Sequence, residues 1–147
     1  MSYSGTFKPK NPQKYRGNAN NIIYRSTWEA RYMTWLDNSP SVIWWTSEEL
    51  AIPYISPIDG KRHRYFVDFV VNLDTKTGPK VFMIEIKPFK QTQEPKTQKR
   101  ITKKYLTEVA TWGINQAKWK AAEDYCLDRK WTFKILTENE LFNSTNK

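Results

Sequence analysis

The sequence predicts an α/β or α+β domain in which helices flank one central, mixed sheet. The order of hydrophobic patterns is the first observation: a helical pattern, a run of β-type segments, a long helical pattern and a final β-type segment. Size is the second, because 147 residues, 39% of them hydrophobic and 15% aromatic, can form one compact domain with its own core. We expect a single domain over residues 22–142.

The two ends differ from that domain in composition. Residues 1–21 are rich in Lys, Asn, Gly and Pro and show no alternation, which predicts an extended basic N-terminal arm. The last residues, 143–147, are expected to form a frayed tail. The aromatic side chains of the arm, including Phe7 and Tyr15, leave two alternatives open: packing on the domain or stacking on nucleic-acid bases.

The first half of the domain begins with a helix over "STWEARYMTWLD". Trp28, Tyr32 and Trp35 recur along one stripe of it, and Ser26 suits the N-cap. Short strands are expected at "SVIWW" and "EELAIPY". After the turn-forming "SPIDG", one long strand segment is expected from Lys61 to Leu73, and "DTKTGPK" separates it from the strand "VFMIEIKPF".

The second half is expected to hold a charged loop, "KQTQEPKTQKR", a long helix and a strand. Helical spacing runs from Thr102 to Arg129, and "KWTFKILTE" is the strand. The pattern predicts that one face of this helix is buried, and that face carries Leu106, Ala110, Ile114, Ala117 and Ala121.

The charge balance favours a polyanionic partner. Lys and Arg number 24 against 15 Asp and Glu, a net charge of +9. Cys126 is the only cysteine, which excludes an internal disulfide and a cysteine-rich zinc site. No apolar run reaches membrane-spanning length and the start lacks a signal peptide's apolar middle, so we expect a soluble cytoplasmic protein without a membrane partner.

The cations cluster in two segments that are candidates for contacts with DNA phosphates. A solvated charge run is the alternative for both segments. The candidate DNA-binding residues are Lys8, Lys10, Lys14, Arg16, Lys90, Lys96, Lys99, Arg100, Lys103 and Lys104.

Charged residues interrupt two strands that are otherwise apolar. Alternation places Glu85 and Lys87 on one face of their strand, about 7 Å apart. If the two strands form a hairpin centred between Lys76 and Thr77, Asp68 lies opposite Glu85. Opposed carboxylates in an apolar sheet suit a hard divalent cation such as Mg²⁺. A solvated outer face with an ion pair remains the alternative, and a register shift of one residue would separate the carboxylates.

Asp68 followed by Glu85-Ile86-Lys87 resembles the D…E-x-K core of the PD-(D/E)XK nuclease superfamily. The usual proline is absent, because Val67 precedes Asp68. The resemblance implies a restriction-endonuclease-like core and a Mg²⁺-dependent deoxyribonuclease, with Mn²⁺ as a substitute. It also implies that Asp68, Glu85 and the backbone carbonyl of Ile86 bind the metal, and that Lys87 orients the attacking water.

Two further residues receive roles through this resemblance. Glu29 matches an upstream helical glutamate that binds metal directly or through water. It also completes a Ser26-x-x-Glu29 capping box, and both alternatives stay open. Gln116 lies where some relatives carry a helical glutamine, although Lys120 replaces the tyrosine of the Q-x-x-x-Y form.

Nearly the whole chain also resembles the head completion nucleases of T-even type tailed phages. The matching segments include "HRYFVDF", "MIEIKP", "YLTEVAT", "NQAKWKAAEDYC" and "FKILTE". The resemblance implies action on packaged double-stranded DNA so that heads join tails, phage head or neck proteins as partners, and a place in the host cytoplasm or at the phage head. A homodimer is consistent with the sequence. Two alternatives are a non-catalytic DNA-binding head-assembly protein and a junction-resolving nuclease of the same superfamily.

Overall fold

A four-stranded sheet forms the centre of the computed structural model, which describes residues 4–142. Its strand order is β3-β6-β7-β8, and the strands span Val42–Ser47, Phe69–Thr75, Gly78–Ile86 and Thr132–Leu136. The β3-β6 and β6-β7 pairs are antiparallel, whereas β8 runs parallel to β7. The predicted mixed sheet is confirmed.

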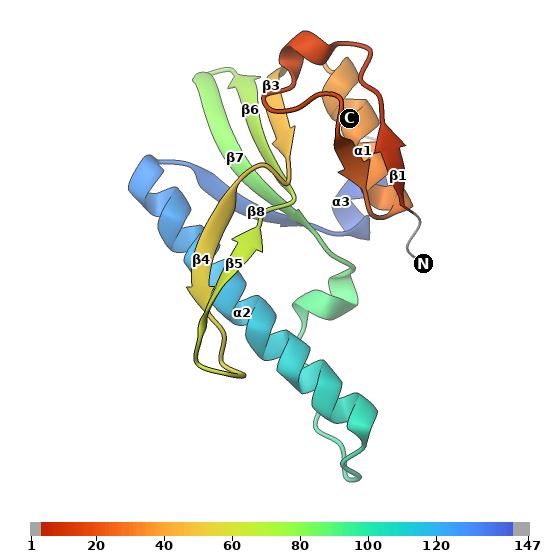
Figure 1. Cartoon of the computed structure of the whole chain (residues 1–147), viewed down its shortest axis with the longest axis vertical. Helices are drawn as coiled ribbons and strands as arrows, with labels where there is room; N and C mark the ends of the chain where they lie inside the picture. The colour runs from red at the N-terminus through yellow and green to blue at the C-terminus, as the bar shows by residue number, and fades with distance from the viewer. Residues whose placement is uncertain (1–3, 143–147) are drawn as a thin grey trace.

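One helix packs on each face of this sheet (Figure 1). Helix α1 (Thr27–Asn38) begins at its predicted N-cap, Ser26, and its side chains Met33 and Leu36 share a core with Phe69. Helix α2 (Lys103–Arg129) connects β7 to the parallel strand β8 and packs Ala122 against the opposite face. Parallel neighbours require such a crossover.

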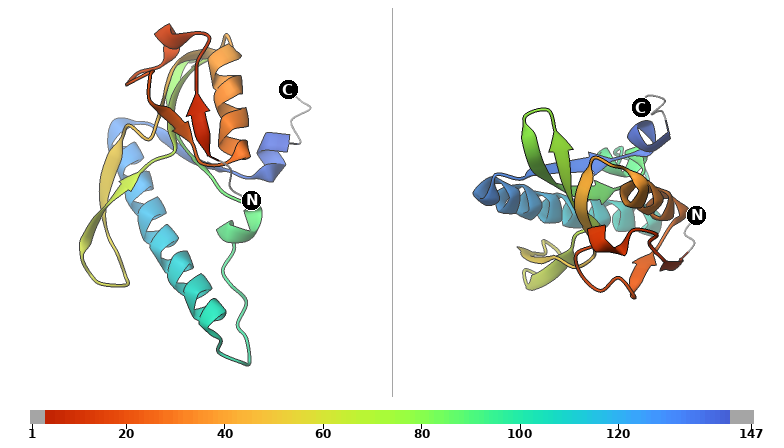
Figure 2. Two further views of the ribbon diagram at one scale, coloured as in Figure 1. Left: turned by 45° about the vertical axis from the view of Figure 1, so that its right-hand side comes forward. Right: turned by 90° about the horizontal axis from the view of Figure 1, so that it is seen from above.

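The N-terminal half of α2 projects away from the sheet, as Figures 1 and 2 show. The buried residues of the helix all lie from its middle onward: Asn115, Trp119, Ala122 and Cys126. The predicted apolar face is therefore only partly buried: Leu106 is 57% exposed, whereas Ala121 packs against the core. Periodicity identified the helix, but the position of the sheet selects a neighbouring stripe and leaves the first turns uncovered.

The long strand expected from Lys61 to Leu73 is two strands. Strand β5 (Arg62–Phe66) pairs with β4 (Ala51–Ile55) in a separate two-stranded sheet, and β6 begins only at Phe69. The break at residues 67–68 allows the chain to leave one sheet and enter the other. The β4–β5 hairpin packs against α2.

Residues 4–21 are folded onto the domain, so the prediction of an extended arm is wrong for them. Strand β1 (Gly5–Phe7) pairs with β2 (Ile22–Tyr24), and a 3₁₀ turn, η1, covers Pro12–Lys14. The Tyr15 ring is buried edge-to-face on Trp45, with centroids 4.7 Å apart. Of the two alternatives for the arm's aromatic residues, packing on the domain holds for Phe7 and Tyr15, because both rings contact Trp45.

Two short helices complete the described chain. The 3₁₀ turn η2 covers Phe89–Thr92, and α3 covers Glu138–Phe142. The expected tail at 143–147 lies outside the described residues. Within residues 4–142, no helix is both long and apolar enough to cross a membrane.

Candidate active site

Asp68 and Glu85 meet where β6 begins and β7 ends. Phe69 pairs with Ile84, and the ladder runs without a shift to the pair of Thr75 with Gly78. Continued by one residue, this register sets Asp68 opposite Glu85. The predicted register is thereby confirmed, and both carboxylates belong to the sheet face that α2 covers.

The environment of Asp68 favours its protonated form. Its Oδ2 accepts a hydrogen bond from the backbone N–H of Ile86 at 2.8 Å. Burial raises the pKa of Asp68 well above its usual value and the charge of Glu85 raises it further, while the hydrogen bond from Ile86 opposes the rise. Part of the residue nevertheless remains accessible to solvent. Asp68 is thus enclosed on the protein side and open toward a ligand.

Glu85 is the more deeply buried carboxylate, with 5% of the residue exposed. Its Oε1 accepts a hydrogen bond from the hydroxyl of Tyr65. Burial raises the pKa of Glu85, while that hydrogen bond and the positive charges of Lys87 and Lys118 oppose the rise. Two neighbouring carboxylates with raised pKa values lie side by side, an arrangement typical of catalytic and metal sites.

Lys87 lies beside this pair, as alternation along β7 predicted. Its Nζ is 3.7 Å from Oε2 of Glu85, and its side chain is 27% exposed. The backbone N–H of Lys87 donates to the carbonyl of Leu136 at 3.0 Å, which fixes the end of β7 to the end of β8. The ammonium group therefore lies at the edge of the site, where a water or a phosphate can reach it.

Glu29 caps α1, which is one of the two roles that the sequence left open, and its metal role stays a prediction. The hydroxyl of Ser26 accepts from the N–H of Glu29 at 3.2 Å, and Oε1 of Glu29 accepts from the N–H of Arg25 at 3.1 Å. The N-cap is therefore present, with the reciprocal bond made one residue earlier than in a standard capping box. Burial raises the pKa of Glu29, and the charge of Glu85 contributes to the rise. The Glu29 carboxylate therefore caps α1 and is also close enough to Glu85 to interact with its charge.

Sequence patterns did not single out Tyr65 and Lys118. Tyr65 is buried on β5, and burial followed by the charge of Glu85 raises the pKa of its hydroxyl, which stays a donor. Lys118 projects from α2 and places its Nζ 5.5 Å from the centre of the Tyr65 ring. No motif or spacing in the sequence marks either residue for this position.

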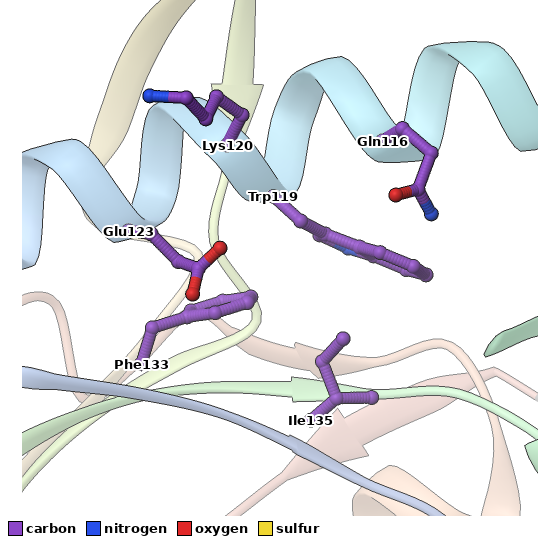
Figure 3. Close-up of a pocket in the computed structure, with 6 residues that line it drawn as sticks. All are labelled: Gln116, Trp119, Lys120, Glu123, Phe133 and Ile135. Carbon is purple, nitrogen blue, oxygen red and sulfur yellow. The ribbon is translucent and has the colours of Figure 1, made fainter.

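Gln116 lies on a different side of α2 from Lys118. It lines a hollow of about 390 Å³ between α2 and β8, together with Trp119 and Ile135 (Figure 3). Ile135 is the partner of Glu85 in the β7-β8 ladder, so the hollow adjoins the strand that carries the site. No hydrogen bond joins Gln116 to a site carboxylate among the described residues. Its active-site role stays a prediction.

The predicted phosphate-binding cations separate into two groups. The six in the second segment are all exposed: Lys90, Lys96, Lys99, Arg100, Lys103 and Lys104. In the first segment Lys8, Lys10 and Arg16 are exposed, but Nζ of Lys14 donates to the carbonyls of Asp37 at 3.0 Å and Ser39 at 2.7 Å. Lys14 therefore binds the C-terminal end of α1.

The chemistry of the donor set suits Mg²⁺. Hard cations take carboxylate and carbonyl oxygens, and Asp68, Glu85 and the carbonyl of Ile86 supply these. Within residues 4–142, no three His, Cys, Asp or Glu side chains gather closely enough to hold an ion by themselves. An ion at this site would therefore complete its coordination with backbone oxygen and water, as Mg²⁺ commonly does.

Two comparisons bear on what this arrangement does. The sequence model of the family described as "TnsA-like endonuclease N terminal" matches residues 39–138, which include Asp68, Glu85 and Lys87. Over 145 residues the chain is 43% identical to the head completion nuclease of Enterobacteria phage T4, and the alignment covers 96% of this chain and 95% of that one.

Proposed function

The chain belongs to the TnsA-like endonuclease family, whose fold is of the PD-(D/E)XK type, and on this basis we propose that it is a Mg²⁺-dependent deoxyribonuclease. Membership of this family and the similarity to the T4 head completion nuclease identify the protein as a nuclease. Metal dependence and the identity of the site are the proposed part. The observation that supports them best is the pair of opposed carboxylates with raised pKa values, Asp68 and Glu85, with Lys87 beside it.

The proposed reaction is hydrolysis of a phosphodiester bond. A water oxygen forms a bond to phosphorus and loses a proton, the bond from phosphorus to the leaving oxygen breaks, and the leaving oxygen takes up a proton. Asp68, Glu85 and the carbonyl of Ile86 would hold the ion. When bound, Mg²⁺ supplies Lewis-acid activation of the phosphate and stabilises the leaving oxygen.

Side chains of the protein supply the other functions that the reaction needs. Lys87 orients the attacking water and offsets the negative charge that develops on the phosphate, because its ammonium lies beside Glu85 at the open edge of the site. Tyr65 fixes the orientation of Glu85 through its hydroxyl. The exposed cations between Lys90 and Lys104 contact backbone phosphates, which predicts weak sequence preference.

The biological setting proposed for this activity is phage head completion. The T4 relative carries that description and is similar along nearly the whole chain. We propose that the protein acts on packaged DNA so that heads join tails, in the host cytoplasm or at the phage head, with head or neck proteins as partners.

Plasmid cleavage tests the proposed activity. Supercoiled DNA is incubated with wild type in Mg²⁺, in Mn²⁺ and in EDTA, alongside Asp68→Asn, Glu85→Gln and Lys87→Ala. Metal-dependent cutting by wild type and its loss in all three variants is expected, while Lys80→Ala, in the same strand but exposed, keeps full activity. Folded variants that cut like wild type would show that the site lies elsewhere. Binding of DNA without cleavage would favour a non-catalytic assembly role, and preference for branched DNA would favour a junction resolvase.

A further inference from the structure

The β4–β5 hairpin, residues 51–66, projects from the same side of the molecule as the N-terminal half of α2 (Figures 1 and 2). One of its faces is packed: Ile52 and Tyr65 are buried in a cluster that includes Ala122 of α2. Alternation along β5 turns Arg62 and Arg64 to the other face, and both are exposed. The hairpin is thus anchored by one face and presents arginines on the other.

These arginines carry uncompensated charge. The hairpin has one acidic residue, Asp59, and its carboxylate already accepts from the N–H of Lys61 at 2.9 Å and contacts Nε2 of His63 at 2.9 Å. Within the described part of the chain, neither Arg62 nor Arg64 forms an ion pair. The guanidinium of Arg64 lies 4.9 Å from the centre of the Phe66 ring, a contact that leaves its donors free for a ligand.

We propose that the exposed face of the β4–β5 hairpin binds the sugar-phosphate backbone of double-stranded DNA through Arg62 and Arg64. The guanidinium group matches phosphate oxygens in a two-pronged geometry. This inference rests on the proposed function, because it takes DNA as the substrate. It adds a second contact surface to the exposed cations of residues 90–104, on an element that the sequence did not mark for DNA binding.

The hairpin is also connected to the site. Tyr65 lies between Arg64 and Phe66 on β5, and its hydroxyl points the other way, to Glu85. DNA held by the outer face of β5 is therefore held by the same strand that orients a site carboxylate. A phosphate bound there has a fixed position relative to the scissile bond, which favours a productive geometry.

A protein partner is the other candidate for this surface. Ile55, Ile58 and Phe66 are 59%, 60% and 45% exposed, and an apolar partner would cover them. Such a partner would also remove two unpaired guanidinium groups from water, which is unfavourable unless it supplies acids. The DNA backbone satisfies both groups directly, so the charges favour DNA.

Binding of a short fluorescein-labelled duplex, followed by anisotropy, tests the proposal. All proteins carry Glu85→Gln, which separates affinity from cleavage. The test variant is Arg62→Gln with Arg64→Gln, and the control is Lys76→Gln with Lys80→Gln, which removes the same charge from the turn of the β6–β7 hairpin and the adjoining end of β7. Thermal unfolding confirms that both are folded. For the test variant, Kd is expected to rise about tenfold, and the slope of log K against log salt to fall by about 2.

A variant that keeps both positive charges separates the effect of charge from that of the guanidinium geometry. Arg62→Lys with Arg64→Lys is expected to restore most of the salt slope while binding more weakly than wild type, because lysine lacks the fork geometry. If the test and control variants bind with the same Kd and slope, the hairpin does not contact DNA and the inference is overturned. Cutting by wild type is scored separately. No cutting in any metal, together with a selective loss of binding in the test variant, would overturn the proposed function and leave the hairpin surface standing.

Discussion

The hydroxyl of Tyr65 donates a hydrogen bond to Oε1 of Glu85, so a strand outside the central sheet orients a carboxylate within it. Tyr65 belongs to β5 and Glu85 to β7, and each lies in a different sheet. Removing a group that orients a metal-binding carboxylate typically lowers metal affinity by about 10- to 100-fold. The β4–β5 hairpin is therefore a structural part of the site.

Replacing Tyr65 with Phe is expected to weaken Mg²⁺ binding about tenfold and to slow plasmid nicking, because Glu85 loses the donor that fixes it. Calorimetric metal titration measures the affinity. Tyr54→Phe is the matched control, since the ring of Tyr54 also lies near Lys118, with 5.9 Å from Nζ to its centre. An equal loss in Tyr54→Phe would attribute the effect to the hairpin as a whole rather than to the hydrogen bond.

The raised pKa values of Asp68 and Glu85 predict how stability depends on pH without metal. The folded protein keeps these protons at pH values where the unfolded chain has lost them, so their contribution is complete below the unfolded pKa and is lost as pH rises through the folded pKa. Above about pH 4, the ordinary pKa of an Asp side chain, Asp68→Asn is therefore expected to gain stability relative to wild type. Urea denaturation at each pH measures the difference.

In excess Mg²⁺, wild type is expected to be more stable than Asp68→Asn. Metal binds the ionised carboxylates, so it stabilises wild type more strongly as pH rises and stabilises Asp68→Asn little. The same urea titrations in Mg²⁺ and in EDTA provide the comparison. If Mg²⁺ leaves the urea midpoint of wild type unchanged at every pH, metal binding at Asp68 and Glu85 is contradicted.

Separate substitutions distinguish the capping role of Glu29 from a metal role. Ser26→Ala removes the oxygen that accepts from the N–H of Glu29 and is expected to cost about 1 kcal/mol of stability, with metal affinity unchanged. Glu29→Gln keeps an acceptor for the N–H of Arg25 but removes the charge, so it is expected to weaken Mg²⁺ binding with little loss of stability. If Glu29→Gln binds Mg²⁺ as tightly as wild type, capping of α1 is the only one of the two roles that Glu29 has.

Tyr15 is expected to be essential for the folded N-terminal segment. Its hydroxyl donates to Oε2 of Glu49 at 2.8 Å and accepts from the buried N–H of Ser47 at 3.1 Å. Tyr15→Phe removes the acceptor for that buried N–H as well as the bond to Glu49, and should cost about 1–3 kcal/mol in thermal or urea unfolding. Tyr105→Phe, on the projecting part of α2, is the control and should change stability little.

The sequence predicts the pair of Asp68 and Glu85 because a hairpin relates its strands by simple symmetry. Once the centre of the turn is placed between Lys76 and Thr77, every partner follows, and the observed ladder has that register. The position of Lys87 follows from the same alternation. This part of the candidate site depends on local geometry alone.

Tyr65 could not be found in the same way, because its role depends on a break in the chain. On one continuous strand, Tyr65 and Asp68 would point to opposite faces. The change of sheet at residues 67–68 rotates β5 and brings the Tyr65 hydroxyl to Glu85. Lys118 depends in turn on where the hairpin packs on α2. Both are consequences of tertiary structure.

Two further features of the fold, helix α3 and the burial of Tyr15, differ in how clearly the sequence marks them. Thr137-x-x-Glu140 has the form of a capping box, and Oε1 of Glu140 accepts from the N–H of Thr137 at 2.6 Å, so α3 was predictable. The burial of Tyr15 was not, because it depends on the ring of Trp45, which the chain brings from β3.

The parallel pairing of β7 with β8 has a consequence for how the protein reaches its active form. It joins Phe82 to Thr132, fifty positions apart, and it includes Glu85 with Ile135. Closing so long a loop is entropically unfavourable, and topologies with distant pairings fold slowly. Until β8 docks, the edge of β7 that carries Glu85 has no neighbour on that side. We therefore expect cutting activity to return in refolding experiments only with the final ordering of the sheet, so that collapsed but incomplete chains leave DNA intact.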